Sequence, residues 1–345
     1  MQNRRNFLAK LSILGSASVL SGFKPAGSFA SPEMNLSEKV KTAMLAMQRA
    51  SWEQGTAIQA AIETKDDYLL QLMVNEAILR QSRDGRTCML GSNNNVTDPV
   101  AAGAGIIKCY KITGQQKYKD AVDRLYEYCK TRAPRNSEGT LYHLDNSQQL
   151  WSDSIYMLPP FLAAYGDFDE CMKQIRGYRN FLWNTDKQLY SHRWDCRNNS
   201  FISDKCWGGG NGWAIAAFAI IYELLPNDRS DYKKEIAGYI KELSDGLIKH
   251  LRADGLFHDI VDDPSSFVET NLSQMAAFGI YKGVKFGILN SGYKEKADKM
   301  KAGAISKIDT FGYVRDACGS PSFDKPGTST EAQAFYLMME AASKS

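Results

Sequence analysis

The sequence predicts an all-α fold, an (α/α)6 barrel in which six helical hairpins close into a toroid. Apolar residues recur at helical spacing along nearly all of the 345 residues, whereas the alternation of apolar and polar residues that marks strands is almost absent. The expected helices also alternate between apolar all round and charged on one face. This alternation repeats six times, with 46 to 63 residues between successive apolar starts, as in arrays of α-hairpins.

Two sets of helices follow from this alternation, in chain order. The outer set carries charge on one face, as solvent-facing helices do, and is expected at 36–48, 67–82, 116–132, 168–183, 230–251 and 291–306. The inner set is rich in Ala, Gly, Ile, Phe and Met, as helices buried on all sides should be. Its members are expected at 52–63, 99–113, 152–165, 212–225, 267–283 and 330–342.

Residues 1–30 are expected to be an export signal. The pattern from Arg4 and Arg5 to Leu8 resembles a twin-arginine signal, a short apolar stretch follows, and cleavage is expected after Ala30. An amphipathic first helix is the alternative, but Gly and Ser interrupt the stretch and it has no acidic residue. No Pro/Gly/Ser-rich linker divides the rest, so residues 31–345 are expected to form one catalytic domain.

Charge and composition exclude several classes of protein. The signal contains four basic residues and no acidic one, so the formal charge falls from +3 to −1 when it is removed. A near-neutral domain without Lys/Arg clusters gives no reason to expect nucleic acid. No apolar run reaches the roughly 18 residues of a membrane span. We expect a periplasmic or secreted protein without a membrane anchor; the oligomeric state stays open.

The seven cysteines give no sign of a metal site. They form no Cys-x-x-Cys pair and have no His at ligand spacing, so neither metal nor cofactor is expected. Cys196 and Cys206 flank a loop, and a disulfide between them is compatible with an oxidising compartment. The odd total leaves at least one thiol outside such pairing.

Unusual residues gather at the starts of the inner helices, which lie at one end of a closed toroid. N-capping accounts for Thr97, Ser152 and Ser329, but not for the position of four of the six Trp. Aromatic faces beside carboxylates and amides suit sugar rings, so a carbohydrate cleft is expected. The segments are Trp52–Gly55, Asn95–Asp98, Leu150–Asp153, Trp207–Trp213, Ser265–Thr270 and Gly327–Glu331.

Three of these segments, Leu150–Met157, Trp207–Ala214 and Val261–Thr270, resemble signature segments of the unsaturated glucuronyl and rhamnogalacturonyl hydrolases, glycoside hydrolase families 88 and 105. Asp98, 55 residues before Asp153, falls where that family carries its other functional aspartate. The resemblance runs from about Trp52 to the C-terminus. It implies an (α/α)6 barrel acting on oligosaccharides that end in a Δ4,5-unsaturated uronate left by a polysaccharide lyase.

The resemblance also implies a mechanism that needs no cofactor. Asp153, kept protonated by burial beside Trp151, would give a proton to C4 of the C4=C5 bond, and water would add to C5. The hemiketal would then open and release the remaining sugar chain. Asp98 would position the substrate or raise the pKa of Asp153. Substrate contacts are expected from Trp52, Trp151, His192, Trp207, Asn211, Trp213 and Glu269.

The chain departs from the family pattern at two places. The family usually has Arg in Trp-Gly-Arg-Gly-Asn-Gly-Trp, where this chain has Gly209, and this puts substrate specificity in doubt. His192 matches a family His-x-Trp-Asp segment only loosely. The neighbouring Arg193 is a candidate for the missing charge.

Other functions stay open at this point. A conventional inverting or retaining glucuronidase would pair Asp153 with Asp98 or with Glu269. A sugar-binding protein without catalysis is a different class, but the presence of both aspartates argues against it. A lyase would need a Tyr, His or Arg set, for which the four His form no motif: His143, His192, His250 and His258.

Structural roles are the alternative for each candidate. Asp153 and Glu269 could cap their helices, and His192 could be a structural hydrogen-bonding group. Trp207 and Trp213 could both belong to the core. The other three His are expected at the surface or as hydrogen-bonded core residues.

Overall fold

The computed structural model describes residues 34–89 and 94–345. The expected export signal, residues 1–30, lies outside the described residues. Leu36–Ser345 forms one compact unit of helices with three small sheets. In the part of the chain that the structure describes, no helix is both long and apolar enough to cross a membrane.

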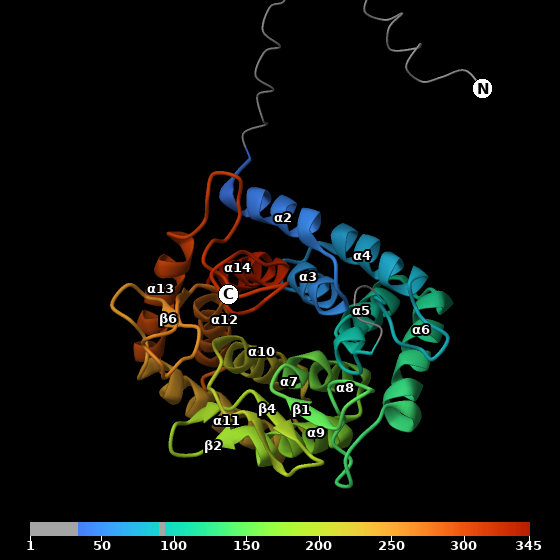
Figure 1. Ribbon diagram of the computed structural model, residues 1–345. Helices are drawn as coiled ribbons and strands as arrows, with labels where there is room; N and C mark the ends of the chain where they lie inside the picture. The colour runs from blue at the N-terminus through green and yellow to red at the C-terminus, as the bar shows by residue number, and fades with distance from the viewer. Residues whose placement is uncertain (1–33, 90–93) are drawn as a thin grey trace, which may run out of the picture. The chain divides into compact units, whose positions relative to one another are not determined.

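Helices form an outer and an inner ring within this unit (Figure 1). The outer helices are α2 (Leu36–Met47), α4 (Asp67–Leu79), α6 (Gln116–Glu127), α9 (Phe168–Leu182), α11 (Ser230–Ile248) and α13 (Ser291–Ile305). The inner helices are α3 (Ser51–Glu63), α5 (Gly103–Thr113), α7 (Ser154–Met157) with α8 (Pro159–Tyr165), α10 (Gly208–Leu224), α12 (Asn271–Lys285) and α14 (Thr330–Ala342).

The inner ring is closed. Each inner helix contacts the next, from α3 through α5, α8, α10 and α12 to α14, and α14 returns to contact α3. Most residues of the inner helices are buried, and their side chains form the core. Glycine permits close approach between neighbouring inner helices: a Cβ on Gly279 of α12 would lie 2.7 Å from the Ile215 side chain of α10. These contacts confirm the predicted (α/α)6 barrel.

Several boundaries differ from the predicted helices. Helix α5 begins at Gly103 rather than at 99, and α10 begins at Gly208 rather than at 212. The segment expected as one helix over 152–165 is divided at Leu158, because Pro159 has no N–H to continue the ladder. The helix expected from residue 267 begins at Asn271, since Val268–Glu269 forms β7 and pairs with β6 (Phe257–His258). Helix α6 ends in a π-helical turn, Tyr128–Arg132.

Short strands that the sequence pattern did not reveal precede the inner helices. Strands β1 (Gln149–Trp151), β4 (Arg193–Asp195) and β5 (Ser200–Ser203) form an antiparallel sheet in the order β1-β4-β5. Strands β2 (Trp183–Asn184) and β3 (Leu189–Tyr190) form a second pair. Elements of two to four residues are too short to show alternation. Because β1 leads into α7, the first sheet lies at the start of an inner helix.

All seven cysteines are free thiols, six of them buried. Cys196 and Cys206 therefore do not form the disulfide considered above. Burial raises the pKa of the Cys206 thiol to about 12, so this group is a small core residue rather than a reactive thiolate.

Candidate active site

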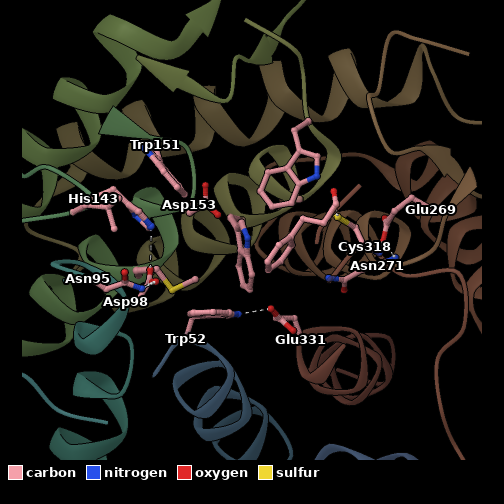
Figure 2. A pocket seen from close by; sticks show the side chains of 16 residues that line it. Trp52, Asn95, Asp98, His143, Trp151, Asp153, Glu269, Asn271, Cys318 and Glu331 are labelled. Atoms are coloured by element: carbon pink, nitrogen blue, oxygen red, sulfur yellow. Dashed lines mark hydrogen bonds and ion pairs between the residues drawn. The ribbon is translucent and has the colours of Figure 1, made fainter. Parts of the chain in front are cut away.

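A cavity of about 250 Å³ opens where the inner helices begin (Figure 2). Its walls come from the starts of α3, α7, α10, α12 and α14 and from the turn at Asp98–Val100. We call it the inner cavity. Its lining residues are Trp52, Asn95, Asp98, His143, Leu144, Trp151, Asp153, Met157, Trp207, Gly209, Trp213, Glu269, Asn271, Cys318, Phe323 and Glu331.

A larger space of about 890 Å³ adjoins it, which we call the outer cavity. The two share four lining residues, Trp151, Asp153, Trp207 and Phe323. The outer cavity is also lined by residues of β4 and β5 and of the loops around 259–267 and 322–326. The small, aromatic inner cavity suits one terminal sugar ring, and the wider outer cavity suits the chain attached to it.

Asp98 is deeply buried in the inner cavity. Its Oδ2 accepts a hydrogen bond from the Asn95 amide, and its Oδ1 lies 3.8 Å from His143 Nε2. Burial raises the pKa of Asp98 well above its ordinary value, and the negative charge of Asp153 raises it further. The hydrogen bond from Asn95 opposes this rise but does not cancel it. The surroundings of Asp98 therefore favour its protonated form.

Asp153 differs from the expectation that burial keeps it protonated. Burial does raise its pKa, but His192 and His143 outweigh burial, and the pKa of Asp153 lies below its ordinary value. His192 Nε2 lies 3.6 Å from Asp153 Oδ2, an ion-pair distance longer than a hydrogen bond. The direction of this shift is opposite to the expected one: the surroundings of Asp98 favour the protonated carboxyl, and those of Asp153 favour the ionised carboxylate.

The carboxylate of Asp153 does not cap α7. Although Asp153 is the residue before that helix, its side chain accepts no capping hydrogen bond. Its Oδ2 is buried and has no hydrogen-bond partner. A buried carboxylate oxygen without a partner is costly unless a ligand supplies one. By contrast, Ser329 caps α14 as predicted, by accepting from Ala332 N–H. The capping predicted for Thr97 and Ser152 is wrong, since the hydroxyl of neither residue makes a capping hydrogen bond.

His143 lines the inner cavity, although it belongs to no recognisable sequence motif. Its ring stacks on Trp151 with centroids 4.3 Å apart and planes at 13°. Its Nδ1 lies 3.1 Å from Thr97 Oγ1 and 3.0 Å from Ser154 Oγ. Burial lowers the pKa of His143 to about 4, so the imidazole is neutral near pH 7. It lies in an irregular loop, away from any helix start, and no spacing signal marks it.

His192 and Trp207 form one wall of the outer cavity. The centroids of their rings lie 4.6 Å apart, and Trp207 Nε1 donates a hydrogen bond to Asp259 Oδ1 at 3.1 Å. The Trp207 ring also covers Gly209, so that any Cβ at position 209 would collide with it. The tight fit explains why this chain has glycine there.

Trp52 and Glu331 lie side by side at the inner cavity (Figure 2). Trp52 Nε1 donates to Glu331 Oε1 at 2.5 Å, while the other carboxyl oxygen is buried without a partner. Burial raises the pKa of Glu331 to about 7, and the charge of Glu53 contributes. Trp213 also lines the cavity but packs mainly against Tyr156, with ring centroids 4.7 Å apart.

Glu269 lines the cavity but is committed to structure. It accepts hydrogen bonds from the backbone N–H groups of Asn271, Leu272 and Cys318 at 2.7 to 2.9 Å. It therefore caps the start of α12, the alternative role considered above. Burial raises its pKa to about 7, although these three hydrogen bonds oppose the rise.

Asn211 is the predicted substrate contact that the structure places elsewhere. It is fully buried and lines neither cavity. Its amide accepts from Tyr190 N–H at 2.8 Å and donates to the carbonyls of Tyr190 and Trp207 at 3.0 and 2.9 Å. All its hydrogen bonds are used in joining β3 to the start of α10, so Asn211 positions this segment instead.

Within residues 34–89 and 94–345, no three His, Cys, Asp or Glu side chains are grouped so as to hold a metal ion. A six-hairpin barrel with an aromatic, carboxyl-lined cavity at one end has the architecture of a six-hairpin glycosidase. The model of Glycosyl Hydrolase Family 88 matches residues 28–344, and the chain belongs to this family.

Curated relatives and solved structures agree with this assignment. The chain is 26% identical over 230 residues to "Unsaturated rhamnogalacturonyl hydrolase YesR" of Bacillus subtilis (strain 168), covering 62% of this chain and 64% of the relative. It is 27% identical over 183 residues to an "Unsaturated 3S-rhamnoglycuronyl hydrolase" of Alteromonas sp. (strain LOR), covering 49% and 44%. The matches thus span between about half and two thirds of these relatives.

The fold is also that of a solved structure described as a possible member of the GH105 family, from Klebsiella pneumoniae subsp. pneumoniae MGH 78578. The TM-score is 0.78 at 17% identity, and the match covers 94% of this chain and 98% of the other. At this identity the likeness establishes the fold alone.

Proposed function

We propose that this protein removes a Δ4,5-unsaturated uronic acid from the non-reducing end of lyase-generated oligosaccharides by hydrating the C4=C5 bond. The observation that carries the proposal is the pair Asp98 and Asp153, which line one small aromatic cavity and have opposite pKa shifts. Membership of Glycosyl Hydrolase Family 88 and the activities of the two curated relatives support it.

The opposite pKa shifts assign an acid and a base. A group that holds its proton at neutral pH can act as general acid, and an ionised neighbour can act as general base. Asp98 gives its proton to C4, while Asp153 takes a proton from the water that adds to C5. The acid role thus moves from Asp153, where the sequence placed it, to Asp98. Asp153 Oδ2 accepts no hydrogen bond in the protein and is available to accept that proton.

The remaining steps need no further reagent. Addition of water gives a hemiketal at C5, whose hydroxyl stands beside the ring oxygen. Cleavage of the bond between C5 and the ring oxygen gives a ketone at C5 and a hemiacetal at C1. The hemiacetal then releases the rest of the chain as an alcohol. Proton transfer from Asp153 back to Asp98 restores the starting state of the pair.

An ultraviolet assay tests the reaction. The purified protein is incubated with unsaturated uronyl disaccharides, and the absorbance of the conjugated double bond is followed. We expect the absorbance to fall with the wild type and at least 10²-fold more slowly with Asp98→Asn and with Asp153→Asn, which removes general acid or base catalysis. Performed in ¹⁸O-labelled water, the reaction should place the label at C5.

A conventional glycosidase would give a different result. It would cleave a saturated glucuronide, leave the double bond intact, and place the label at C1 of the released uronate. That result would replace the hydration mechanism. A protein that binds these sugars without any turnover would support the non-catalytic alternative.

We also propose that residues 1–30 direct export and that the mature protein is periplasmic or secreted. The proposal rests on the twin-arginine-like pattern and the apolar stretch that follows it. N-terminal sequencing of protein from the native host should find a chain that starts near residue 31. An intact N-terminus in the cytoplasmic fraction would contradict it.

A further inference from the structure

The two cavities differ in charge. Four carboxyl groups line the inner cavity, and no Lys or Arg stands among its lining residues. The cations that line the outer cavity are Arg193, Lys205 and Lys325. A sugar acid brings its own negative charge, which the ionised Asp153 repels. The carboxylate of a uronate is therefore expected where the inner cavity opens into the outer one.

Arg193 occupies this boundary and is fixed there by the sheet. It lies on β4 directly opposite Trp151 of β1, and Trp151 lines both cavities. The guanidinium carbon lies 5.1 Å from the centroid of the Trp151 ring. Because His143 also stacks on that ring, the indole is held firmly. This aromatic contact limits the guanidinium to a small region of space.

Within the described residues, the guanidinium of Arg193 forms no hydrogen bond and no ion pair. Its Nε is buried and has no hydrogen-bond partner. No Asp or Glu of the described chain forms an ion pair with it, whereas the neighbouring Arg197 pairs with Asp195 at 3.4 Å. A buried donor without an acceptor costs free energy that a bound anion would recover. Lys205 and Lys325 are exposed and lack the planar fork that matches a carboxylate.

We propose that Arg193 binds the carboxylate of the unsaturated uronate and thereby determines specificity for an acidic terminal sugar. This inference rests on the proposed function, which supplies the uronate. The carboxylate is attached to C5 itself. Since Asp153 lines both cavities, an anion held by Arg193 places C5 next to Asp153. Arg193 thus orients the double bond as well as recognising the charge.

Arg193→Gln, Arg193→Lys and a matched control, Lys205→Gln, test this role. Each is assayed on an unsaturated uronyl disaccharide and on its uronate methyl ester, which has no charge. For Arg193→Gln we expect kcat/KM on the acid to fall about 10- to 100-fold, the effect of losing hydrogen bonds to a charged group. On the ester it should change less than about threefold. Arg193→Lys should recover part of the loss, and Lys205→Gln, whose side chain is exposed, should leave the ratio of the acid and ester kcat/KM values within about threefold of the wild type.

Three results would overturn the proposal. Equal losses on acid and ester from Arg193→Gln would mean that Arg193 only supports Trp151, which a thermal melt of the variant would detect. Loss of the acid preference in Lys205→Gln, but not in Arg193→Gln, would assign the carboxylate to Lys205. If Arg193→Gln keeps the preference for the acid over the ester but no longer distinguishes sulfated from unsulfated leaving sugars, the anion that Arg193 binds would belong to the leaving sugar.

Failure of the proposed function itself would look different. The wild type would then leave the double bond of both acid and ester intact, before any variant is compared. A preference for the acid over the ester that is present in the wild type and lost in Arg193→Gln would support both proposals together.

Discussion

Glu331→Gln tests the electrostatics of the inner cavity with a change of one atom. The carboxyl group is buried, one oxygen accepts from the Trp52 indole, and the other has no partner. A Gln amide keeps the shape and can keep the acceptor for Trp52. The substitution therefore removes the ionisation of Glu331 while retaining its packing.

The direction of the effect follows from proton linkage. Burial raises the pKa of Glu331 from 4.5 to about 7 in the folded protein. Below pH 4.5 the group is protonated in both states, so stability is fully retained. Between pH 4.5 and 7 the unfolded chain releases the proton and the folded chain holds it, so the free energy of unfolding falls as pH rises. Above about pH 7 the full loss is present, about 3 kcal/mol.

Glu331→Gln does not suffer this loss. We expect the variant to match the wild type near pH 4.5 and to exceed its free energy of unfolding by up to about 3 kcal/mol at pH 8. Urea unfolding at a series of pH values measures the difference. Glu295→Gln, the same change at an exposed position of α13, is the control and should follow the wild type. A difference that stays constant from pH 4.5 to 8 would refute the reasoning.

Three further predictions concern the same end of the barrel and its core. Asn95→Ala removes the hydrogen bond that lowers the pKa of Asp98, so the alkaline limb of the kcat–pH profile should move to higher pH; a shift to lower pH would contradict Asp98 as acid. Gly279→Ala should lower the free energy of urea unfolding by about 1–3 kcal/mol, because its Cβ would lie 2.7 Å from Ile215. Trp52→Phe removes the indole N–H that donates to the buried carboxyl of Glu331 and should cost about 1.5–3 kcal/mol in the same measurement.

Most of the fold could be predicted because each of its parts is long and periodic. Helices of 11 to 19 residues such as α5 and α11 show their buried face in the spacing of their apolar residues. The closure of the inner helices into a ring could be predicted from the sixfold repeat of helical hairpins. The strands could not be predicted, since Arg193–Asp195 and its partners pair through backbone groups over very few residues. Helix ends depended on local breaks such as Pro159.

The candidate site was only partly predictable, for a physical reason. Residues next to an inner helix start, such as Trp52 and Asp98, come together because the toroid places all the starts at one end. His143 and Phe323 reach the same cavity from irregular loops, whose paths no periodicity describes. The direction of the pKa shift of Asp153 depends on where His192 lies relative to it. The sheet of β1, β4 and β5, which the sequence did not predict, determines that position.

Asp153 and Glu269 show why a position at a helix start does not reveal the role of a carboxylate. Both precede an inner helix and both line the inner cavity. The first N–H groups of α12 donate to Glu269, so this carboxylate is consumed by the orphan donors of its helix. At α7 no N–H group donates to the Asp153 side chain, and its buried Oδ2 accepts no hydrogen bond. A carboxylate that its own helix does not use remains available to a substrate, which is why Asp153 rather than Glu269 pairs with Asp98 in the proposed reaction.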